Sequence, residues 1–307
     1  MAFTRDSVPD LRGRTAVVTG ANGGLGLETA AVLADKGASV ILAARDQDKA
    51  RAALESIRAR SPHAMLELVE LDLASQASVR RAAQTIRDGH DRLDILVNNA
   101  GVMAMPERRT EDGYEMQLGV NHLGHWTLTA LLMPTLAAAP AARVVTVTST
   151  AHHFGRALDP DNPHLQGRYD PWRAYAQSKL ANYHFGLGLQ AELERAGSSA
   201  MSLIAHPGLS HSGLQTTTVT EGGGGPLGPF FAWMAAHTGM EVAAGAMPQI
   251  RAATDPRAVG GEFYGPRFVN TGRAVRLPVL RRGSAEAIET LWAVSERETG
   301  VALEVTR

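Results

Sequence analysis

A tyrosine and a lysine stand four residues apart in the segment YAQSK, at Tyr175 and Lys179. In a helix this spacing places both side chains on the same face. An ammonium beside a phenol favours the phenolate, so we expect Lys179 to lower the pKa of Tyr175 from its usual value of about 10. Tyr175 could then exchange a proton with a substrate oxygen near neutral pH. The pair predicts general acid/base chemistry.

Lysine is scarce in this chain, which makes the position of each lysine informative. Of the 30 basic residues only Lys36, Lys49 and Lys179 are lysine, and the other 27 are arginine. A GC-rich genome explains the excess of arginine without reference to function. Lys36 and Lys49 fall on predicted helix surfaces. Lys179 stands where a compact ammonium is needed and a planar guanidinium would fit poorly.

The glycine-rich segment TGANGGLG at residues 19–26 is a second candidate site. It lies between an apolar run and a helical pattern. Its glycines would let the backbone turn tightly and approach a pyrophosphate, which would then meet the positive end of the following helix. No G-K-[ST] motif follows, which argues against a nucleoside triphosphate loop. The segment predicts dinucleotide binding.

The residues that end the second apolar run, Ala43-Ala44-Arg45, bear on which dinucleotide binds. Sites that prefer NAD usually have an acid here, which holds the ribose hydroxyls. Arg45 could instead make a bidentate contact with the 2′-phosphate of NADP. Asp46, one place later, could instead bind the ribose hydroxyls, as the acid of an NAD site does. The sequence favours NADP and leaves NAD open.

The elements that must position these residues alternate along the first two thirds of the chain. Apolar runs predict strands at 15–19, 39–44, 66–71, 93–97, 143–148 and 200–205. Helical patterns cover 26–37, 46–61, 75–88, 111–138 and 174–196. Uniformly apolar strands separated by helices of this length are typical of a parallel sheet covered on both faces. The pattern predicts a doubly wound α/β sheet, in which the end of the fifth strand would bring Ser149 to the ligand crevice.

The composition argues against several other classes of function. The 307 residues include 30 basic and 31 acidic side chains, so a net charge of −1 gives no reason to expect nucleic acid or an anionic membrane as a partner. The chain has no cysteine, which removes thiol nucleophiles, thiolate metal sites and disulfides. We find no signal-peptide pattern and no apolar run long enough to span a bilayer, and expect a cytoplasmic protein.

The histidines at 122, 125, 152 and 153 lack a metal-ligand spacing such as H-E-x-x-H, and we expect no metal site. They are interpreted as helix-face and loop residues. His152 and His153 come just after Ser149, so contact with a substrate is an open alternative for these two.

Two irregular segments and a terminal helix complete the chain. Residues 151–172 predict an ordered substrate loop, and 284–299 predict a C-terminal helix that begins at Ser284 and stops at Gly300. Residues 209–240, with four consecutive glycines at 222–225, predict either a mobile lid or a flexible surface insertion. Exposed apolar groups would be unfavourable in water, which favours the lid. The large apolar residues of the two irregular segments predict a hydrophobic or bulky substrate: Phe154, Trp172, Phe230, Phe231, Trp233 and Met234.

Taken together, these motifs resemble the short-chain dehydrogenase/reductase family over nearly the whole chain. The matching features are TGANGGLG at 19–26, Asp72-Leu73, Asn98-Asn99-Ala100-Gly101, Asn121, Ser149, Tyr175 with Lys179, and Pro207-Gly208. Within the family, VNHLGHWTLT (120–129), YAQSKLAN (175–182) and LWAVSERETG (291–300) are similar to the retinol dehydrogenase and WW-domain oxidoreductase-like branch. The resemblance implies one Rossmann-type domain over residues 1–307, with about seven parallel strands and helices on both faces.

The resemblance also implies a role for each member of a catalytic tetrad. Tyr175 would be the proton donor, and Lys179 would bond the nicotinamide ribose. Ser149 would hydrogen-bond the substrate carbonyl, and Asn121 would complete the tetrad through a water relay. These residues would move hydride between the nicotinamide and a ketone, an aldehyde or a secondary alcohol.

The cofactor contacts that the resemblance implies extend along the chain. Gly20, Gly24 and Gly26 would hold the pyrophosphate, Asp72 the adenine, and Asn98 the central scaffold and the adenosine ribose region. The family usually has a threonine where this chain has Ser212, which keeps the hydroxyl that would meet the carboxamide. The full set of expected contacts is Gly20, Asn22, Gly23, Gly24, Leu25, Gly26, Arg45, Asp72, Leu73, Asn98, Ala100, Gly101, Tyr175, Lys179, Pro207, Gly208, Leu209 and Ser212.

Two rival functions and the question of assembly stay open at this point. A non-catalytic NADP-binding sensor or scaffold would be expected to have a damaged tetrad, and all four members are present. An NADPH-dependent reductase of carbon–carbon double bonds, as in the related light-dependent enzymes, relies on a cysteine near the substrate, which this chain lacks. The family often forms dimers or tetramers through helices around Asn121 and Tyr175, so a homo-oligomer is a further expectation.

Overall fold

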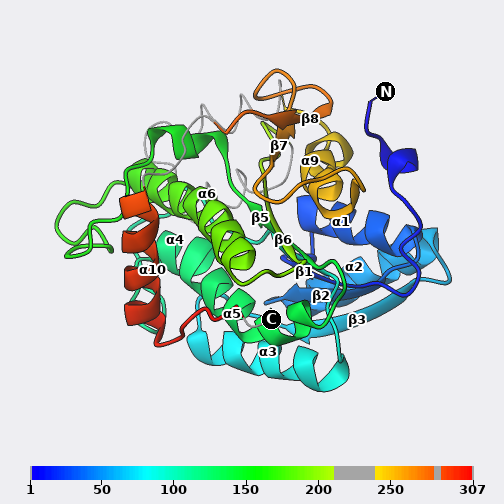
Figure 1. Ribbon diagram of the computed structural model, residues 1–307, viewed down its shortest axis with the longest axis horizontal. Coiled ribbons are helices and arrows are strands. Elements are labelled where there is room, and N and C mark those ends of the chain that lie inside the picture. The colour runs from blue at the N-terminus through cyan, green and yellow to red at the C-terminus, as the bar shows by residue number, and fades with distance from the viewer. Residues whose placement is uncertain (1, 211–238, 280–284, 306–307) are drawn as a thin grey trace.

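The computed structural model describes residues 2–210, 239–279 and 285–305 of the chain, and within these ranges it contains one eight-stranded sheet (Figure 1). The strands lie in the order β3-β2-β1-β4-β5-β6-β7-β8. Neighbouring strands are parallel throughout, except that β8 is antiparallel to β7. The strand bounds are β1 Thr15–Thr19, β2 Ser39–Ala44, β3 Met65–Glu70, β4 Ile95–Asn98, β5 Arg143–Val147, β6 Met201–Ala205, β7 Phe263–Pro266 and β8 Ala274–Leu277.

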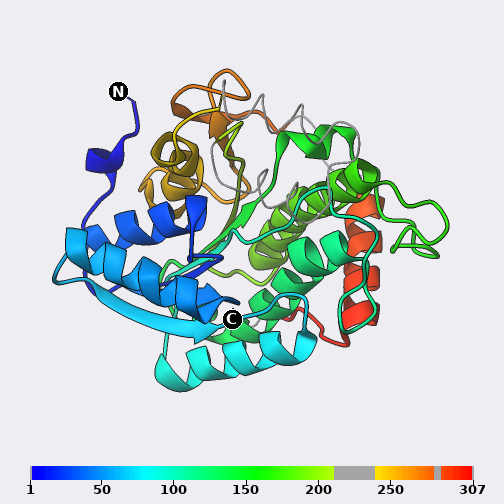
Figure 2. The same ribbon diagram turned by 180° about the vertical axis from the view of Figure 1, so that it is seen from behind.

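Helices cover both faces of this sheet, as the two opposite views show (Figures 1 and 2). One face packs against α1 (Gly24–Asp35), α2 (Gln47–Arg60) and α9 (Val242–Thr254). The other packs against α3 (Gln76–Gly89), α5 (Gly124–Ala137) and α6 (Pro171–Arg195), and α10 (Ala285–Thr299) lies alongside α6. The predicted doubly wound α/β arrangement is confirmed, with eight strands in place of about seven.

The inner strands β1, β2 and β4 are mostly apolar because both of their faces are buried, whereas the edge strand β3 is largely exposed. Along β1, Val17 joins the core on the α3, α5 and α6 side, while Ala16 and Val18 join the core on the α1 and α9 side. All three side chains are fully buried. A strand whose two faces pack into two cores has a continuous run of apolar residues. Such runs were the sequence signal that predicted the strands β1 to β6.

The structure departs from the sequence predictions where elements are short or irregular. The helix expected over 111–138 is three pieces: α4 (Met116–Leu118), a π-helical turn (Gly119–Leu123) and α5. The strands β7 and β8 and helix α9 were not predicted, and β7 contains glycine and proline, which weaken any strand signal. The expected loop over 151–172 includes a 3₁₀ turn at Thr150–Phe154 and gives way to α6 at Pro171.

The order of the strands fixes the position of the candidate site. Strands β2 and β3 lie on one side of β1, whereas β4 and the later strands lie on the other, so the carboxyl ends of β1 and β4 border a crevice. Residues 211–238, which include most of the expected lid and Ser212, lie outside the described residues. On either side of that gap, the Met240 amide donates a hydrogen bond of 2.8 Å to the Leu209 carbonyl.

Candidate active site

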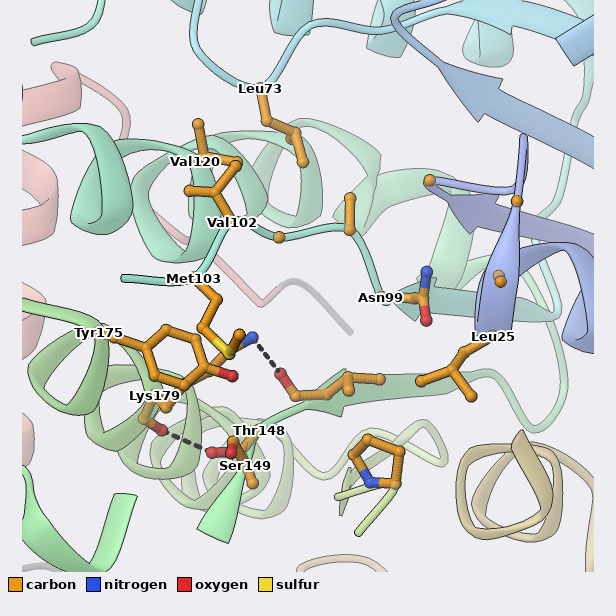
Figure 3. Close-up of a pocket in the computed structure, with 18 of the residues that line it drawn as sticks. Leu25, Leu73, Asn99, Val102, Met103, Val120, Thr148, Ser149, Tyr175 and Lys179 are labelled. Carbon is orange, nitrogen blue, oxygen red and sulfur yellow. Dashed lines mark hydrogen bonds between the residues drawn. The ribbon is translucent and has the colours of Figure 1, made fainter. Parts of the chain in front are cut away.

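A cavity of about 800 Å³ opens at the carboxyl ends of the strands and collects most of the predicted site residues (Figure 3). From the predicted set it is lined by Gly20, Asn22, Gly23, Gly24, Leu25, Gly26, Arg45, Asp72, Leu73, Ala100, Gly101, Ser149, Tyr175, Lys179, Pro207, Gly208 and Leu209. Asn98 and Asn121 do not line it, because both side chains are buried behind its wall. The position of Ser212 lies outside the described residues.

The glycine-rich loop at one end of the cavity fits a bound phosphate group. Gly20 has a φ of +66°, which favours glycine, and a Cβ on Gly26 would lie 2.3 Å from the Gly20 carbonyl oxygen. Helix α1 begins at Gly24, and its N-cap residue Gly23 has no side chain to accept the first amide protons. Those amide groups therefore remain available to an anion, as a pyrophosphate site requires.

Hydrogen bonds between neighbouring strand ends hold this loop in place. The Thr19 hydroxyl accepts from the backbone amides of Asn99 and Ala100, at 2.9 Å each. The Asn99 side chain donates to the Thr19 carbonyl at 2.8 Å and accepts from the Gln249 amide at 3.0 Å. Asn99, which was absent from the predicted contacts, lines the cavity, whereas its neighbour Asn98 donates to Thr129 in the core. The available signal in the sequence was the adjacent pair of asparagines. Successive side chains at the end of a strand point to opposite sides, so only one member of the pair faces the cavity.

The groups that would distinguish NADP from NAD stand at the end of β2. Arg45 is exposed and lines the cavity, and no carboxylate among the described residues forms a salt bridge with it. Asp46 caps α2 by accepting from the Lys49 amide at 3.0 Å, and its carboxylate pairs with the Lys49 ammonium at 3.2 Å. The bond with the Lys49 amide holds the pKa of Asp46 below its usual range. The acid that could compete for a ribose is thus engaged within its own helix.

Tyr175, Lys179 and Ser149 converge on the central part of the cavity (Figure 3). The Lys179 ammonium lies 5.8 Å from the centroid of the Tyr175 ring, and both side chains are about 95% buried. Burial raises the pKa of the Tyr175 phenol, which a hydrogen bond with the Ser149 side chain partly offsets. Burial also lowers the pKa of Lys179 to about 8. The sequence-based expectation for the Tyr175 pKa was therefore wrong in direction, because desolvation by burial is the largest influence on it.

Contacts with backbone carbonyl groups fix helix α6, which carries Tyr175 and Lys179, against the end of strand β5. The Thr148 hydroxyl donates to the Lys179 carbonyl at 2.6 Å, and the Lys179 ammonium donates to the Val147 carbonyl at 3.4 Å; Figure 3 shows both bonds. Ser149 caps the 3₁₀ turn by accepting from the Ala151 amide at 3.2 Å. Tyr175, Lys179 and Ser149 thus stand on elements whose relative position is set by main-chain groups.

Asn121 lies behind these residues, in the π-helical turn. Its amide oxygen accepts from the Val102 amide at 2.8 Å, and its amide nitrogen donates to the Val102 carbonyl and the Ser178 hydroxyl at 2.9 Å each. Both amide protons are therefore committed to the scaffold. A π turn inside a helix is often found at a functional site, and here it carries a predicted member of the tetrad.

The part of the cavity beyond Tyr175 is apolar. Of the six large apolar residues that the sequence predicts, Phe154 and Trp172 line it, and the remaining four fall outside the described residues. Sequence reasoning missed a group of aliphatic and thioether side chains in the same wall: Val102, Met103, Met105, Met116 and Val120. Met103 and Met105 flank Ala104, whose φ of +46° is unfavourable outside glycine. Flexible thioethers adapt to apolar ligands of irregular shape.

The histidines near the site are structural in their contacts. His152 is buried, stacks on the Tyr183 ring at 4.6 Å and donates from Nδ1 to the Ser149 carbonyl at 2.6 Å. Neither His152 nor His153 lines the cavity. Within the described ranges no group of three or more His, Cys, Asp or Glu residues could hold a metal ion. No helix in those ranges is both long and apolar enough to cross a bilayer.

The fold and the site together agree with a family of known oxidoreductases. A model of the short chain dehydrogenase family matches residues 14–221, which is most of the chain and includes the glycine loop and Tyr175. The protein belongs to the short-chain dehydrogenase family and is an oxidoreductase of that type.

Curated relatives extend the likeness over nearly the full length. Human retinol dehydrogenase 13 is 38% identical over 94% of this chain and 85% of its own length. Mouse polyprenol dehydrogenase is also 38% identical, over 97% and 87%.

Solved structures confirm the architecture. The crystal structure of an uncharacterised protein from Mycobacterium paratuberculosis is 41% identical, covers 99% of each chain and superposes with a TM-score of 0.80. A short chain dehydrogenase from Escherichia coli CFT073 in complex with NADPH is 24% identical, covers 83% of this chain and 98% of its own, and has a TM-score of 0.63. The latter likeness extends to the fold alone.

Proposed function

We propose that this protein is an NADP(H)-dependent oxidoreductase that moves hydride between the nicotinamide and an apolar ketone, aldehyde or alcohol. The observation that carries the proposal is the meeting of Tyr175, Lys179 and Ser149 in one cavity with an uncapped, glycine-lined helix N-terminus. The family membership supports the reaction class.

The residues around the cavity divide into two groups with separate tasks. The loop at 20–26 would hold the pyrophosphate, and Arg45 would hold the 2′-phosphate through charge-assisted hydrogen bonds. When bound, NADPH supplies the hydride. Lys179 would hold the nicotinamide ribose, which leaves the apolar wall for the substrate.

Side chains of the protein would carry out the proton transfer. Ser149 would donate a hydrogen bond to the substrate carbonyl oxygen, and Tyr175 would deliver the proton as that oxygen gains charge. A phenol whose pKa is raised by burial is fully protonated at neutral pH, so in this structure it is ready to act as an acid. The positive charge that Lys179 holds close by would stabilise the phenolate after transfer. In the direction of alcohol oxidation the same phenolate is the base.

The apolar wall and the names of the relatives indicate the class of substrate. Met103, Met105 and Trp172 offer contact area and few polar groups to a substrate beyond its reacting carbon. Two relatives are named for retinol and for polyprenol, which are long lipophilic alcohols. An elongated apolar carbonyl compound or alcohol fits both observations.

Replacing the phenol tests the proposal. We expect Tyr175→Phe to reduce the rate of NADPH oxidation with apolar aldehydes and ketones by at least about 100-fold, because general acid catalysis contributes that much or more. NADPH binding, followed by fluorescence titration, should change little. Tyr264→Phe, which alters a buried tyrosine on β7 away from the cavity, is the matched control. A Tyr175→Phe variant with near wild-type turnover would overturn the assignment.

A further inference from the structure

The buried imidazole of His125 joins two parts of the site that the polypeptide otherwise keeps apart. His125 lies one turn after Asn121, where the π-helical turn meets α5, and is 1% exposed. Its Nδ1 lies 3.0 Å from the Asn121 carbonyl oxygen, and its Nε2 lies 2.9 Å from the Thr19 hydroxyl. Thr19 ends strand β1 and precedes the glycine loop.

The direction of every hydrogen bond in this arrangement can be assigned. A carbonyl oxygen can only accept, so Nδ1 of His125 must carry the proton. Burial lowers the pKa of His125 to about 4, so the ring is neutral and its Nε2 is an acceptor. The Thr19 hydroxyl accepts from the amides of Asn99 and Ala100, and its proton has two acceptors within reach, the Val97 carbonyl at 3.4 Å and Nε2 at 2.9 Å; it donates to Nε2, the nearer of the two. These hydrogen bonds form a continuous series from the loop after β4, through Thr19 and His125, to the Asn121 carbonyl.

The end of this hydrogen-bond chain matters because Asn121 can offer the site only acceptor oxygens, of which the backbone carbonyl is one. Both protons of the side-chain amide are committed to Val102 and Ser178. The carbonyl oxygen has two lone pairs, of which His125 occupies one. A Cβ placed on Gly101 would lie 2.9 Å from the Asn121 amide oxygen and 3.4 Å from the Lys179 ammonium, so Asn121 and Lys179 border the same small space.

We propose that His125 is a positioning residue for proton transfer, which holds the Asn121 carbonyl in a fixed orientation relative to the cofactor loop. It touches neither substrate nor cofactor in this role. The part of this inference that concerns proton transfer rests on the proposed function. The hydrogen-bond chain itself rests only on the contacts of Thr19, His125 and Asn121.

Nitrogen NMR of the full chain labelled with ¹⁵N-histidine tests the chain of bonds without any turnover. One of the 11 histidine spin systems should disappear in His125→Asn, which assigns it. We expect this ring to show the neutral Nδ1–H tautomer and no titration between about pH 6 and pH 9. An Nε2–H tautomer, or protonation within that range, would overturn the inference whether or not the protein proves to be an active reductase.

Kinetics of three variants test the consequence for catalysis. His125→Leu removes both bonds, while His125→Asn keeps an amide donor near the Asn121 carbonyl and loses the link to Thr19. His122→Leu is the matched control, because it removes another buried neutral imidazole that bonds instead to Ser295 on α10. We expect His125→Leu to lower kcat by about tenfold and shift its pH dependence, with KM for NADPH and substrate changed less than threefold; such a loss corresponds to 1.36 kcal/mol in the barrier.

The control and the conservative variant separate positioning from simple loss of stability. His122→Leu should lower the melting temperature but leave the pH profile of kcat unchanged. His125→Asn, which retains only the bond to the Asn121 carbonyl, should recover part of the lost kcat. Equal losses of kcat in His125→Leu and His122→Leu, or no rescue in His125→Asn, would contradict the positioning role. If the wild-type protein itself shows no turnover that depends on Tyr175, that result contradicts the proposed function instead.

Discussion

At the scale of single residues, burial controls the chemistry of the site more strongly than charge pairing does. Lys179 and Tyr175 are both removed from water, so each is pushed toward its neutral form. An ammonium held in such a place lowers the stability of the folded chain. A buried lysine of this kind is expected where function requires it, as the proposed role of Lys179 does.

Replacing Lys179 by methionine should separate stability from activity. We expect Lys179→Met to abolish turnover and to raise the free energy of unfolding at pH 7 by roughly 1–3 kcal/mol, because a shift of one pKa unit corresponds to 1.36 kcal/mol. The folded wild type releases its Lys179 proton near pH 8, whereas the unfolded chain retains it to about pH 10.5. Wild-type stability should therefore rise across that window, and the advantage of the variant should shrink.

Urea titrations at pH 7 and pH 10 check this expectation, with Lys36→Met at a half-buried position as the control. A Lys179→Met protein less stable than wild type at pH 7 would show that its hydrogen bond to Val147 outweighs desolvation. Lys179→Arg should also impair turnover despite its charge, because a planar guanidinium does not fit the space of an ammonium. Wild-type activity in Lys179→Arg would contradict that reading of the scarce lysines.

At the scale of elements, the C-terminal helix braces the helix that carries Tyr175. Figures 1 and 2 show α10 alongside α6. A Cβ on Gly188 of α6 would lie 2.4 Å from the Trp292 ring, whose centroid is 5.1 Å from that of Trp126 on α5. The three aromatic rings of Trp126, Phe185 and Trp292 thus form one contact between three helices, and glycine is required where α10 approaches α6 most closely.

A double-mutant cycle tests this contact. We expect Gly188→Ala to lower the free energy of unfolding by about 1–3 kcal/mol, because the added methyl group overlaps Trp292. In a Trp292→Ala background the same change should cost at least about 1 kcal/mol less, because the added methyl group no longer meets the Trp292 ring. Gly89→Ala, at a helical position with open space, is the control and should change stability by under about 0.5 kcal/mol. Additive effects of Gly188→Ala and Trp292→Ala would contradict direct contact.

At the scale of the whole molecule, the cavity draws on both halves of the sheet. Gly20 and Arg45 follow β1 and β2, whereas Ser149 and Pro207 follow β5 and β6. A ligand that binds across this crevice stabilises the folded state as a whole. A ligand at 100 times its dissociation constant adds about 2.7 kcal/mol to the free energy of unfolding.

Thermal unfolding therefore measures the choice of cofactor. We expect NADPH to raise the melting temperature by several degrees, and by more than NADH does at the same concentration, because only NADPH offers a 2′-phosphate to Arg45. Arg45→Ala should remove most of that difference. Arg51→Ala, an exposed arginine on α2 that pairs with Asp48, is the control. Equal shifts with NADH and NADPH in the wild type would contradict the preference for NADP.

Several features of the fold and site follow from local sequence, each for a local physical reason. Buried parallel strands such as Ser39–Ala44 are continuous apolar runs, and the loop at 19–26 needs glycine for its own backbone conformation and close approach. The four-residue spacing of Tyr175 and Lys179 indicates that both lie on the same face of one helix. These signals are visible without knowledge of distant contacts, and they were enough to predict the doubly wound sheet and the position of the cavity.

The tertiary structure decided whatever depends on surroundings rather than on spacing. Desolvation reversed the expected pKa shift of Tyr175, and helix capping engaged Asp46. Packing against the cavity placed Asn99 rather than Asn98 in its wall and added methionines that no motif marked. The hydrogen bonds of His125 join residues 106 positions apart in sequence. Sequence by itself determined which groups are present and in what order, and only folding determined their solvation and their partners, because both depend on atoms far away along the chain.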